Sequence, residues 1–430
     1  MSFNLKYGES EVSVDIPESI GVEVIEAPLL PALGDFHDAF LSALEDPLGS
    51  PPLRKIIPPS GEVAIVVSDR TRPCMYPVVL PLLLNYLNTL GVSDERMFLL
   101  VAYGAHRRHR DDENRTFYGE EATRRLRLFH HDCRDESRLI QVGTTPRGTP
   151  VRLNKRYLEA GASIVLASVS FHYFAGFGGG RKAIFPGLAS EEGILSNHRI
   201  FVESAGDSLS SILDFKGDVE SNPLNEDLTD ATAMAPPSFA LNVCLNREGD
   251  ISGIFAGDWK ESHRRACQFL LKTCLPLRRK YDLVVASCGG HPKDVNFIQS
   301  HKTIDNAFAF VKPGGVLLVV ASCEDGMGSE SFLQWFEQKD ARAMREALRR
   351  DYSMNGGTAL ALKVKADSCP IYLYSALDRA VVEKMGLRPV LTIEQSLDEI
   401  ARSGEIRLAA VLPEGAVTVA RRESAAGHGS

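Results

Sequence analysis

The sequence predicts an α/β protein built from two α/β domains, each containing a parallel or mixed sheet. Short apolar, β-prone runs alternate with helical stretches along the 430 residues. The runs are apolar on both faces, as in EVAIVVS at 62–68, which is typical of strands covered by helices on both sides. A second strand–helix–strand series begins near Tyr281, after the linker-like segment LPLRRK at 275–280.

The first series contains three expected strands, at 62–68, 97–104 and 163–171. A helix is expected over 77–90, because it has a proline in its first turn and Gly91 stands where a C-cap belongs. A shorter helix is expected over 154–160. This series belongs to an N-terminal domain over 1–275, which the segment 410–430 could complete.

The second series predicts a C-terminal domain over 280–409. Its elements are a strand at 281–290, a helix at 295–311, a strand at 314–323 after the break Pro313-Gly314-Gly315, and a strand-like segment at 407–420.

Charge and composition exclude several functional classes. Lys and Arg total 48 against 56 Asp and Glu, a net charge of −8, so the basic footprint of a nucleic-acid-binding protein is absent. No apolar run approaches the ~18 residues of a membrane span, and the first residues lack the pattern of a secretion signal. The eight cysteines form no CxxC pair, which favours reduced thiols in a cytoplasmic protein.

Polar clusters follow directly on the three strands of the first domain. They are SDRTRP at 68–73, YGAHRRH at 103–109 and SFHYF at 170–174. Ligands of open parallel sheets bind beyond the carboxyl ends of the strands. We therefore expect the three clusters to converge on one crevice.

The third cluster runs into a glycine-rich segment, AGFGGGRKAIFPG at 175–187. Glycines let backbone N–H groups approach an anion, although a flexible turn is the alternative. A P-loop is excluded, because Arg181 and Ala183 flank Lys182 where that motif needs glycine and a hydroxyl residue. Lys182 could contact phosphate or anchor a cofactor covalently, and His198 follows 16 residues later.

In the second domain, GGHPKD at 289–294 leads into the helix that carries Gln299 and Lys302. Their spacing of i, i+3 places an amide and an ammonium on one helical face. Such a pair near a helix N-terminus suits a carboxylate.

Taken together, these motifs resemble the nickel-dependent lactate racemase family. The resemblance rests on SDRTRP, YGAHR, HYFAGFGGGRKAIFPG, NHR at 197–199, NPLNEDLTDATAMA at 222–235 and GGHPKDVNFIQSHK at 289–302. It implies a cofactor and a substrate bound in the cleft between the two domains. The cofactor would be the nickel-pincer nucleotide, Ni(II)-pyridinium-3,5-bisthiocarboxylic acid mononucleotide, supplied by cofactor-synthesis enzymes.

The resemblance also implies roles for individual residues by motif position. Lys182 matches the lysine that links covalently to the cofactor in some members, and His198 matches the nickel ligand. His106 and His172 match the paired acid/base histidines. The loop that contacts the cofactor and the substrate matches Asp69, Arg70, Thr71 and Arg72, and Arg72 would bind the substrate carboxylate. The substrate-binding pair of the second domain matches Gln299 and Lys302.

The implied reaction inverts C2 of a 2-hydroxy acid, lactate or a relative, by reversible hydride transfer to the cofactor. Imidazole suits the proton transfers, because its pKa of about 6.5 allows both protonation states at neutral pH. Two residues depart from the family pattern, Tyr103 and Gly178. A dicarboxylate such as malate is a second candidate substrate, since further cations are offered by Arg107, Arg108, His109, His291 and His301.

Three other functions remain open at this point. A non-catalytic protein that binds carboxylates or the nickel nucleotide would use the same residues without turnover. A pyridoxal-phosphate enzyme would use Lys182 but gives no role to His198 or the histidine pair. A nicotinamide enzyme is the third, but the glycine motif begins well after the strand tip.

Overall fold

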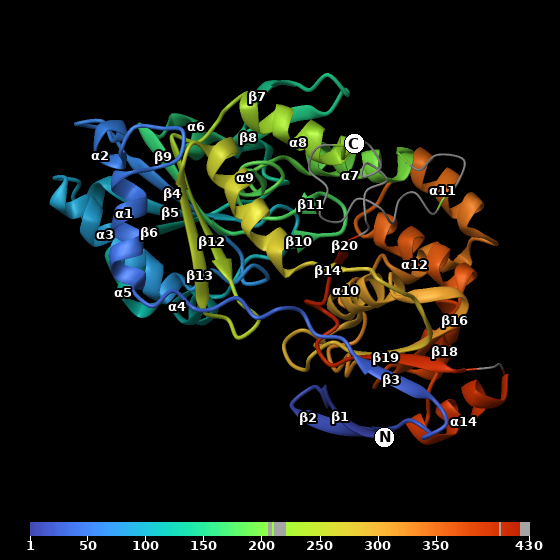
Figure 1. Ribbon diagram of the computed structural model, residues 1–430. Helices are drawn as coiled ribbons and strands as arrows, with labels where there is room; N and C mark the ends of the chain where they lie inside the picture. Colours follow the sequence, from blue (N-terminus) through green and yellow to red (C-terminus); the bar gives the residue numbers. More distant parts are fainter. Residues whose placement is uncertain (205–208, 210–220, 404–405, 422–430) are drawn as a thin grey trace, which may run out of the picture. The chain divides into compact units, whose positions relative to one another are not determined.

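The computed structural model describes residues 1–204, 209, 221–403 and 406–421 (Figure 1). They divide into two compact units. We call 29–201 and 221–272 the N-terminal unit, and 1–28, 202–204, 209, 273–403 and 406–421 the C-terminal unit.

The N-terminal unit is built on a six-stranded mixed sheet. In spatial order its strands are β13 (Ile251–Gly257), β12 (Phe239–Leu245), β9 (Ala162–Ser168), β4 (Val63–Ser68), β5 (Met97–Ala102) and β6 (Arg127–His130). All neighbours are parallel except β12 and β13, which form an antiparallel pair. Two smaller hairpins pair β7 (Leu139–Thr144) with β8 (Pro150–Asn154) and β10 (Phe171–His172) with β11 (Gly176–Phe177).

Helices cover both faces of this sheet, as its apolar strands predict. The helices of this unit are α1 (Phe36–Glu45), α2 (Leu53–Ile56), α3 (Tyr76–Thr89), α4 (Asp111–Tyr118), α5 (Glu120–Arg125), α6 (Lys155–Glu159), α7 (Glu191–Glu203, whose last two residues fall in the C-terminal unit), α8 (Pro223–Ala233) and α9 (Trp259–Leu270). Val63, Ile65 and Val67 of β4 share one core with side chains of α1 and α3. On the other side, α9 packs on β12 and β13 (Figure 1). Gly91, at φ 82°, follows α3 as the sequence predicts.

The C-terminal unit is built on a six-stranded sheet that is parallel throughout. Its spatial order is β18 (Arg388–Pro389), β17 (Ile371–Tyr374), β16 (Val311–Val320), β15 (Tyr281–Ser287), β19 (Leu408–Leu412) and β3 (Gly21–Val24). The helices of this unit are α10 (Phe297–Phe308), α11 (Ala341–Arg350), α12 (Gly356–Ser368), α13 (Arg379–Lys384) and α14 (Ile393–Ser403). β1 (Ser2–Tyr7) pairs with β2 (Ser10–Asp15), and β14 (Leu275–Pro276) with β20 (Ala420–Arg421).

The first 28 residues belong to the C-terminal unit, which differs from the boundary expected from the sequence. β3 lies beside β19 (Figure 1), with Val22 opposite Ala409. Leu5 and Val14 are buried in the core of that sheet. Segments distant in sequence therefore complete one sheet, because each places its apolar side chains there. For the same reason β19 extends the C-terminal sheet, although 410–430 was considered as a completion of the N-terminal domain; 422–430 lie outside the described residues.

Strand β16 also differs from the expectation, since it begins at Val311 and runs through Pro313-Gly314-Gly315. Lys312, Pro313 and Gly314 are exposed. Proline is tolerated at the start of a strand, where its missing N–H costs no ladder hydrogen bond. The Pro-Gly-Gly segment therefore lies inside β16 but does interrupt its pairing with β15, where the register shifts from Tyr281 opposite Val311 to Leu283 opposite Val316.

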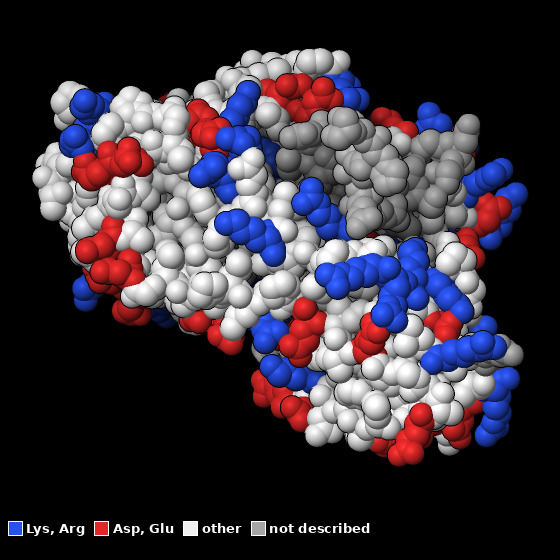
Figure 2. Space-filling view, viewed as in Figure 1, with Lys and Arg blue, Asp and Glu red and all other residues white. Residues whose placement is uncertain are grey.

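No helix within the described ranges has both the length and the apolar character needed to cross a membrane. On the face shown in Figure 2, acidic and basic side chains are interspersed over the N-terminal unit.

Candidate functional site

Three neighbouring strands bring the polar clusters of the N-terminal unit to one edge of its sheet. β4 pairs in parallel with both β5 and β9, so their carboxyl ends face the same way. The chain proceeds from β4 to β5 and β6 in one direction, whereas β9 and β12 lie on the other side of β4. The loops after β4 and β9 therefore flank a topological switch point, where α/β proteins bind ligands.

Asp69, the first residue after β4, is hydrogen-bonded to His106 from the loop after β5. The His106 Nδ1 lies 2.8 Å from Asp69 Oδ2, and Asp69 Oδ1 accepts from the Thr71 backbone N–H at 2.7 Å. Burial opposes ionisation of this carboxyl, but the charge and hydrogen bond of His106, with Arg72, hold its pKa well below the ordinary value. The resemblance made Asp69 a cofactor contact, and the structure adds a contact with the imidazole.

The neighbouring arginines of this loop differ in their partners. Arg70 Nη1 donates to Glu113 Oε1 at 3.0 Å. Arg72 Nη1 donates instead to the Thr71 carbonyl oxygen at 3.0 Å and to its hydroxyl at 3.1 Å. Arg72 thus contacts neutral acceptors, and its charge is felt by both Asp69 and Lys182.

His172 lies in the β10–β11 hairpin that follows β9. Its Nδ1 accepts hydrogen bonds from the backbone N–H groups of Phe174 and Ala175, each at 3.2 Å. The Phe174 ring centroid is 6.2 Å from that of His172 and 6.3 Å from that of His198. Sequence reasoning assigned no role to Phe174, whose ring is near both imidazoles; the run of aromatic residues around it was the available signal.

Lys182 lies in a short 3-10 helix, Gly180–Ala183, after the glycine run. It is half-buried, and burial followed by the charges of Arg72 and Arg181 lowers its pKa from 10.5 to about 7. A lysine with this pKa has a substantial neutral fraction at neutral pH and can act as a nucleophile.

The glycine run is shaped by packing more than by anion binding. Gly179 has φ 75°, and a Cβ there would lie 2.5 Å from the Ser168 carbonyl oxygen. The Gly178 N–H is already bonded to Ser170 O at 2.7 Å. A Cβ at Gly178 would make only ordinary contacts, so the fold does not require glycine at this departure from the family pattern.

Arg181, beside Lys182, is a buried cation held by neutral groups. Its Nε donates to Asn225 Oδ1 at 2.9 Å, and its Nη1 lies 3.1 Å from His263 Nδ1. His263 Nε2 donates to Gly178 O at 3.0 Å, which ties α9 to the glycine run. Burial lowers the pKa of Arg181 to about 10 and, with the Arg181 charge, keeps that of His263 well below its ordinary value.

His198 is carried by α7 and is held as a neutral ring. Its Nδ1 donates to the Ile194 carbonyl oxygen at 2.7 Å. Burial, with the charges of Lys182 and His106, lowers its pKa to about 4. The preceding Asn197 donates to the buried carboxylate of Asp227 at 2.8 Å, which fixes this turn of α7 against α8.

These two side chains fit the cofactor that the resemblance implies. A neutral imidazole with Nδ1–H engaged presents its Nε2 lone pair, which is the arrangement of a metal-binding histidine. A partly neutral amine at Lys182 is the form that bonds to a thiocarbonyl carbon. The charges of Lys182 and of His106 both act on His198, which places each of them near that ring.

Gln299 and Lys302 lie together on α10 of the C-terminal unit. Lys302 Nζ donates to Gln299 Oε1 at 2.6 Å. Asn296 caps this helix, accepting from the Gln299 N–H at 3.0 Å. The expected shared face is therefore present, and the position of this pair in a cleft between domains stays a prediction.

Three of the cations considered for a second carboxylate are already paired or buried. Arg107 donates to Glu113 at 2.8 Å, and Arg70 reaches the same carboxylate. His109 is buried, with its Nε2 accepting from the Arg70 N–H. His301 is also buried. The residues of this set that are buried or paired offer no support for a dicarboxylate.

Tyr103, the other departure from the family pattern, is buried at the end of β5. Its hydroxyl accepts from the His109 N–H at 3.1 Å and donates to His130 Nδ1 at 2.9 Å. The phenol therefore holds the loop that carries His106 against β6.

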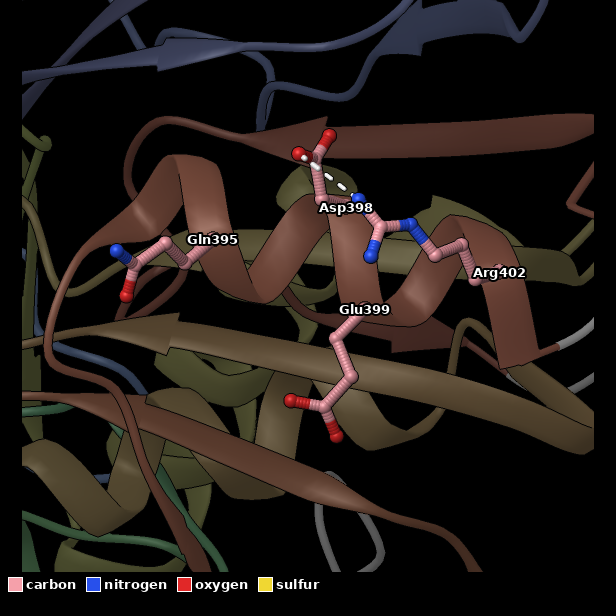
Figure 3. Close-up of a pocket in the computed structure, with 4 residues that line it drawn as sticks. All are labelled: Gln395, Asp398, Glu399 and Arg402. Carbon is pink, nitrogen blue, oxygen red and sulfur yellow. Dashed lines mark ion pairs between the residues drawn. The ribbon is translucent and has the colours of Figure 1, made fainter.

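A surface pocket of the C-terminal unit is lined by none of these residues. Figure 3 shows Gln395, Asp398, Glu399 and Arg402 of α14 lining it, with Arg402 and Asp398 ion-paired at 3.7 Å. It contains no residue singled out from the sequence. Among the described residues, no three His, Cys, Asp or Glu side chains are grouped to hold a metal ion.

Comparison with known proteins identifies relatives over nearly the whole chain. Residues 7–209 match the model of the lactate racemase N-terminal domain, and residues 278–420 that of the lactate racemase C-terminal domain. The curated lactate racemase of Thermoanaerobacterium thermosaccharolyticum is 32% identical over 357 residues, 81% of each chain. That of Lactiplantibacillus plantarum is 28% identical over 380 residues, 87% of this chain and 88% of the relative.

Solved structures also match this chain. The lactate racemase apoprotein from T. thermosaccharolyticum has a TM-score of 0.84 at 28% identity, covering 98% of this chain and 100% of that one. A Thermotoga maritima protein, at 17% identity and a TM-score of 0.69, shares the fold, covering 93% of this chain and 100% of that one. The predicted α/β fold is confirmed, and the chain belongs to the lactate racemase family.

Proposed function

We propose that this protein is a racemase or epimerase that inverts C2 of a 2-hydroxy acid, lactate or a close relative. Two curated relatives that span most of the chain are lactate racemases. The observation that carries the proposal is the grouping of Lys182 and His198 with the Asp69–His106 pair at the strand ends. This grouping supplies a nucleophilic amine, a metal ligand and an acid/base group in one neighbourhood.

The chain's own residues would bind and orient the substrate. Arg72 and Lys302 offer cations for its carboxylate, and Gln299 adds an amide beside Lys302. His106 and His172 would hold and release the hydroxyl proton. The histidines would thus handle only the hydroxyl proton. Because the C2 hydrogen beside a carboxylate is too weakly acidic to leave easily as a proton, it would leave as hydride and needs a separate acceptor.

The nickel-pincer nucleotide would be held by Lys182 and His198, and when bound it supplies that hydride acceptor. The pKa of about 4 keeps His198 neutral at physiological pH, as a nickel ligand must be. The amine of Lys182 would form the covalent link. We infer that the protein depends on cofactor-synthesis enzymes to become active.

The test uses protein produced together with those enzymes. Chiral chromatography should show interconversion of D- and L-lactate, with nickel in stoichiometric amount and a mass adduct on the peptide containing Lys182. His106→Gln and His172→Gln should each abolish interconversion, whereas His37→Gln, at an exposed position, should not. Substrate deuterated at C2 should keep most of its label.

Each contrary result has a distinct meaning. Label washout into solvent would indicate proton abstraction at C2 and refute the hydride route. Bound nickel without turnover of any 2-hydroxy acid would favour a non-catalytic binding protein. Full activity of either histidine variant would remove that residue from its role.

A further inference from the structure

The two histidines proposed to handle the hydroxyl proton differ in what their Nδ1 atoms contact. Nδ1 of His106 lies 2.8 Å from a carboxylate oxygen of Asp69. Nδ1 of His172 lies 3.2 Å from each of two backbone N–H groups, those of Phe174 and Ala175. One contact is an acceptor and the other two are donors, so the rings cannot carry their protons on the same nitrogen.

Asp69 dictates the tautomer of His106. The carboxylate is buried, and its other oxygen already accepts from the Thr71 N–H. An ionised carboxylate can only accept a hydrogen bond. Nδ1 of His106 must therefore carry the proton, which leaves the lone pair of the neutral ring on Nε2.

The hairpin backbone dictates the opposite tautomer for His172. Backbone amides can only donate, so Nδ1 of this ring must present its lone pair to Phe174 and Ala175. The neutral ring then carries its proton on Nε2. Protonating Nδ1 would place an N–H against two other N–H groups, so the imidazolium form is disfavoured in this arrangement.

Resting on the proposed function, we infer that Asp69 is a positioning residue that holds His106 as the proton acceptor, while His172 starts as a neutral hydrogen-bond donor. In the step that His106 performs, the substrate O–H bond breaks and an Nε2–H bond forms. The positive charge stays on the imidazole, beside an Asp69 that remains ionised. Nε2 of His172 already carries a proton, so this ring can accept the hydroxyl proton there only after Nδ1 has left the two backbone amides and taken up a proton while Nε2 has given up its own.

The tautomers can be read directly in the full chain without substrate or cofactor. Protein labelled with ¹⁵N-histidine is titrated by NMR, and spectra are compared above the last titration of both rings. His106→Gln and His172→Gln assign the signals. His106 should show a protonated Nδ1 and a bare Nε2, and His172 the reverse.

The second experiment removes the Asp69 carboxylate. Asp69→Ala should move the two His106 nitrogen shifts toward each other, as both tautomers become populated, and leave His172 unchanged. Asp38→Asn, beside the exposed His37, is the control and should affect neither ring. The remaining histidine signals report whether each variant is folded, and Asp69→Asn replaces the alanine variant if it is not.

The loaded enzyme gives the third readout. Asp69→Asn should lower kcat for lactate by about 10²–10⁴-fold with KM changed little. A His106 ring protonated on Nε2, a His172 ring protonated on Nδ1, or a His106 tautomer indifferent to Asp69→Ala would overturn the inference. Correct tautomers in a protein that racemises nothing would refute the proposed function instead, so the two failures are distinguishable.

Discussion

Lys182 is expected to react as an amine at neutral pH, and this prediction tests the physical basis of cofactor attachment. Burial and the charges of Arg72 and Arg181 lower its pKa from 10.5 to about 7. Both effects disfavour the ammonium form. Removing one of the two cations should therefore raise the pKa of Lys182 part of the way back toward 10.5.

The expected size follows from the shift. At pH 7 a pKa of about 7 leaves about half of the amines neutral, whereas 10.5 leaves about 0.03%, a difference of about 10³-fold. The same shift corresponds to about 5 kcal/mol between the two protonation states. Because the folded pKa lies below the unfolded one, this lysine lowers stability fully below pH 7, and the loss disappears as pH rises toward 10.5.

The assay is reductive methylation of the cofactor-free protein at a series of pH values, with each peptide quantified by mass spectrometry. The rate at Lys182 should rise with a midpoint near pH 7 in the folded protein and near 10.5 in urea. Arg72→Gln should move the folded midpoint upward. Arg127→Gln removes an exposed arginine paired with Glu62 and should leave it unchanged.

A midpoint above pH 9 in the folded protein would show that the amine is hydrated and would refute the reasoning about burial. A midpoint near pH 7 that does not move in Arg72→Gln would support burial as the cause of the lowered pKa. It would refute a contribution from the Arg72 charge.

Three further predictions concern other parts of the chain. His198→Ala should reduce nickel per protein at least about tenfold in material made with the cofactor-synthesis enzymes, measured by mass spectrometry of the metal, because the neutral imidazole is its protein ligand. Asp305→Ala should lower the free energy of unfolding by about 3–5 kcal/mol in urea titrations, because it leaves the fully buried Lys365 ammonium without its carboxylate 2.9 Å away; combining Asp305→Leu with Lys365→Met should recover most of the loss. Gly179→Ala should destabilise by at least about 2 kcal/mol in thermal unfolding, owing to its positive φ and the contact of 2.5 Å, whereas Gly178→Ala should be tolerated; equal stability of the two glycine variants would contradict the packing argument.

Much of the fold could be predicted from the local sequence. The strands β4, β5, β9 and β15 lie within a few residues of their expected positions. Each is a short apolar run bounded by turn residues, so its periodicity is readable without tertiary information. The antiparallel pair β12–β13 was not anticipated, although its two apolar strands are separated by a five-residue turn, 246–250, in which Gly249 has φ 94°.

Long-range pairing could not be read in the same way. The first 28 residues join the C-terminal sheet through contacts such as Val22 with Ala409, nearly 390 positions apart. Nothing in the local pattern of a half-exposed strand such as β3 specifies its partner. The expected boundary at 275, by contrast, lies close to the change of unit between Lys272 and Thr273.

By itself, the sequence determined which residue types stand at the strand ends: the carboxylate and arginines after β4, the histidines after β5 and β9, and the lysine after the glycine run. Only the tertiary structure decided what those groups do to one another. It placed Asp69 against His106 and two backbone amides against His172, and it lowered the pKa of Lys182 through burial and neighbouring cations. Hydrogen-bond partners and desolvation depend on atoms brought together from distant segments, and these set the protonation state on which the chemistry depends.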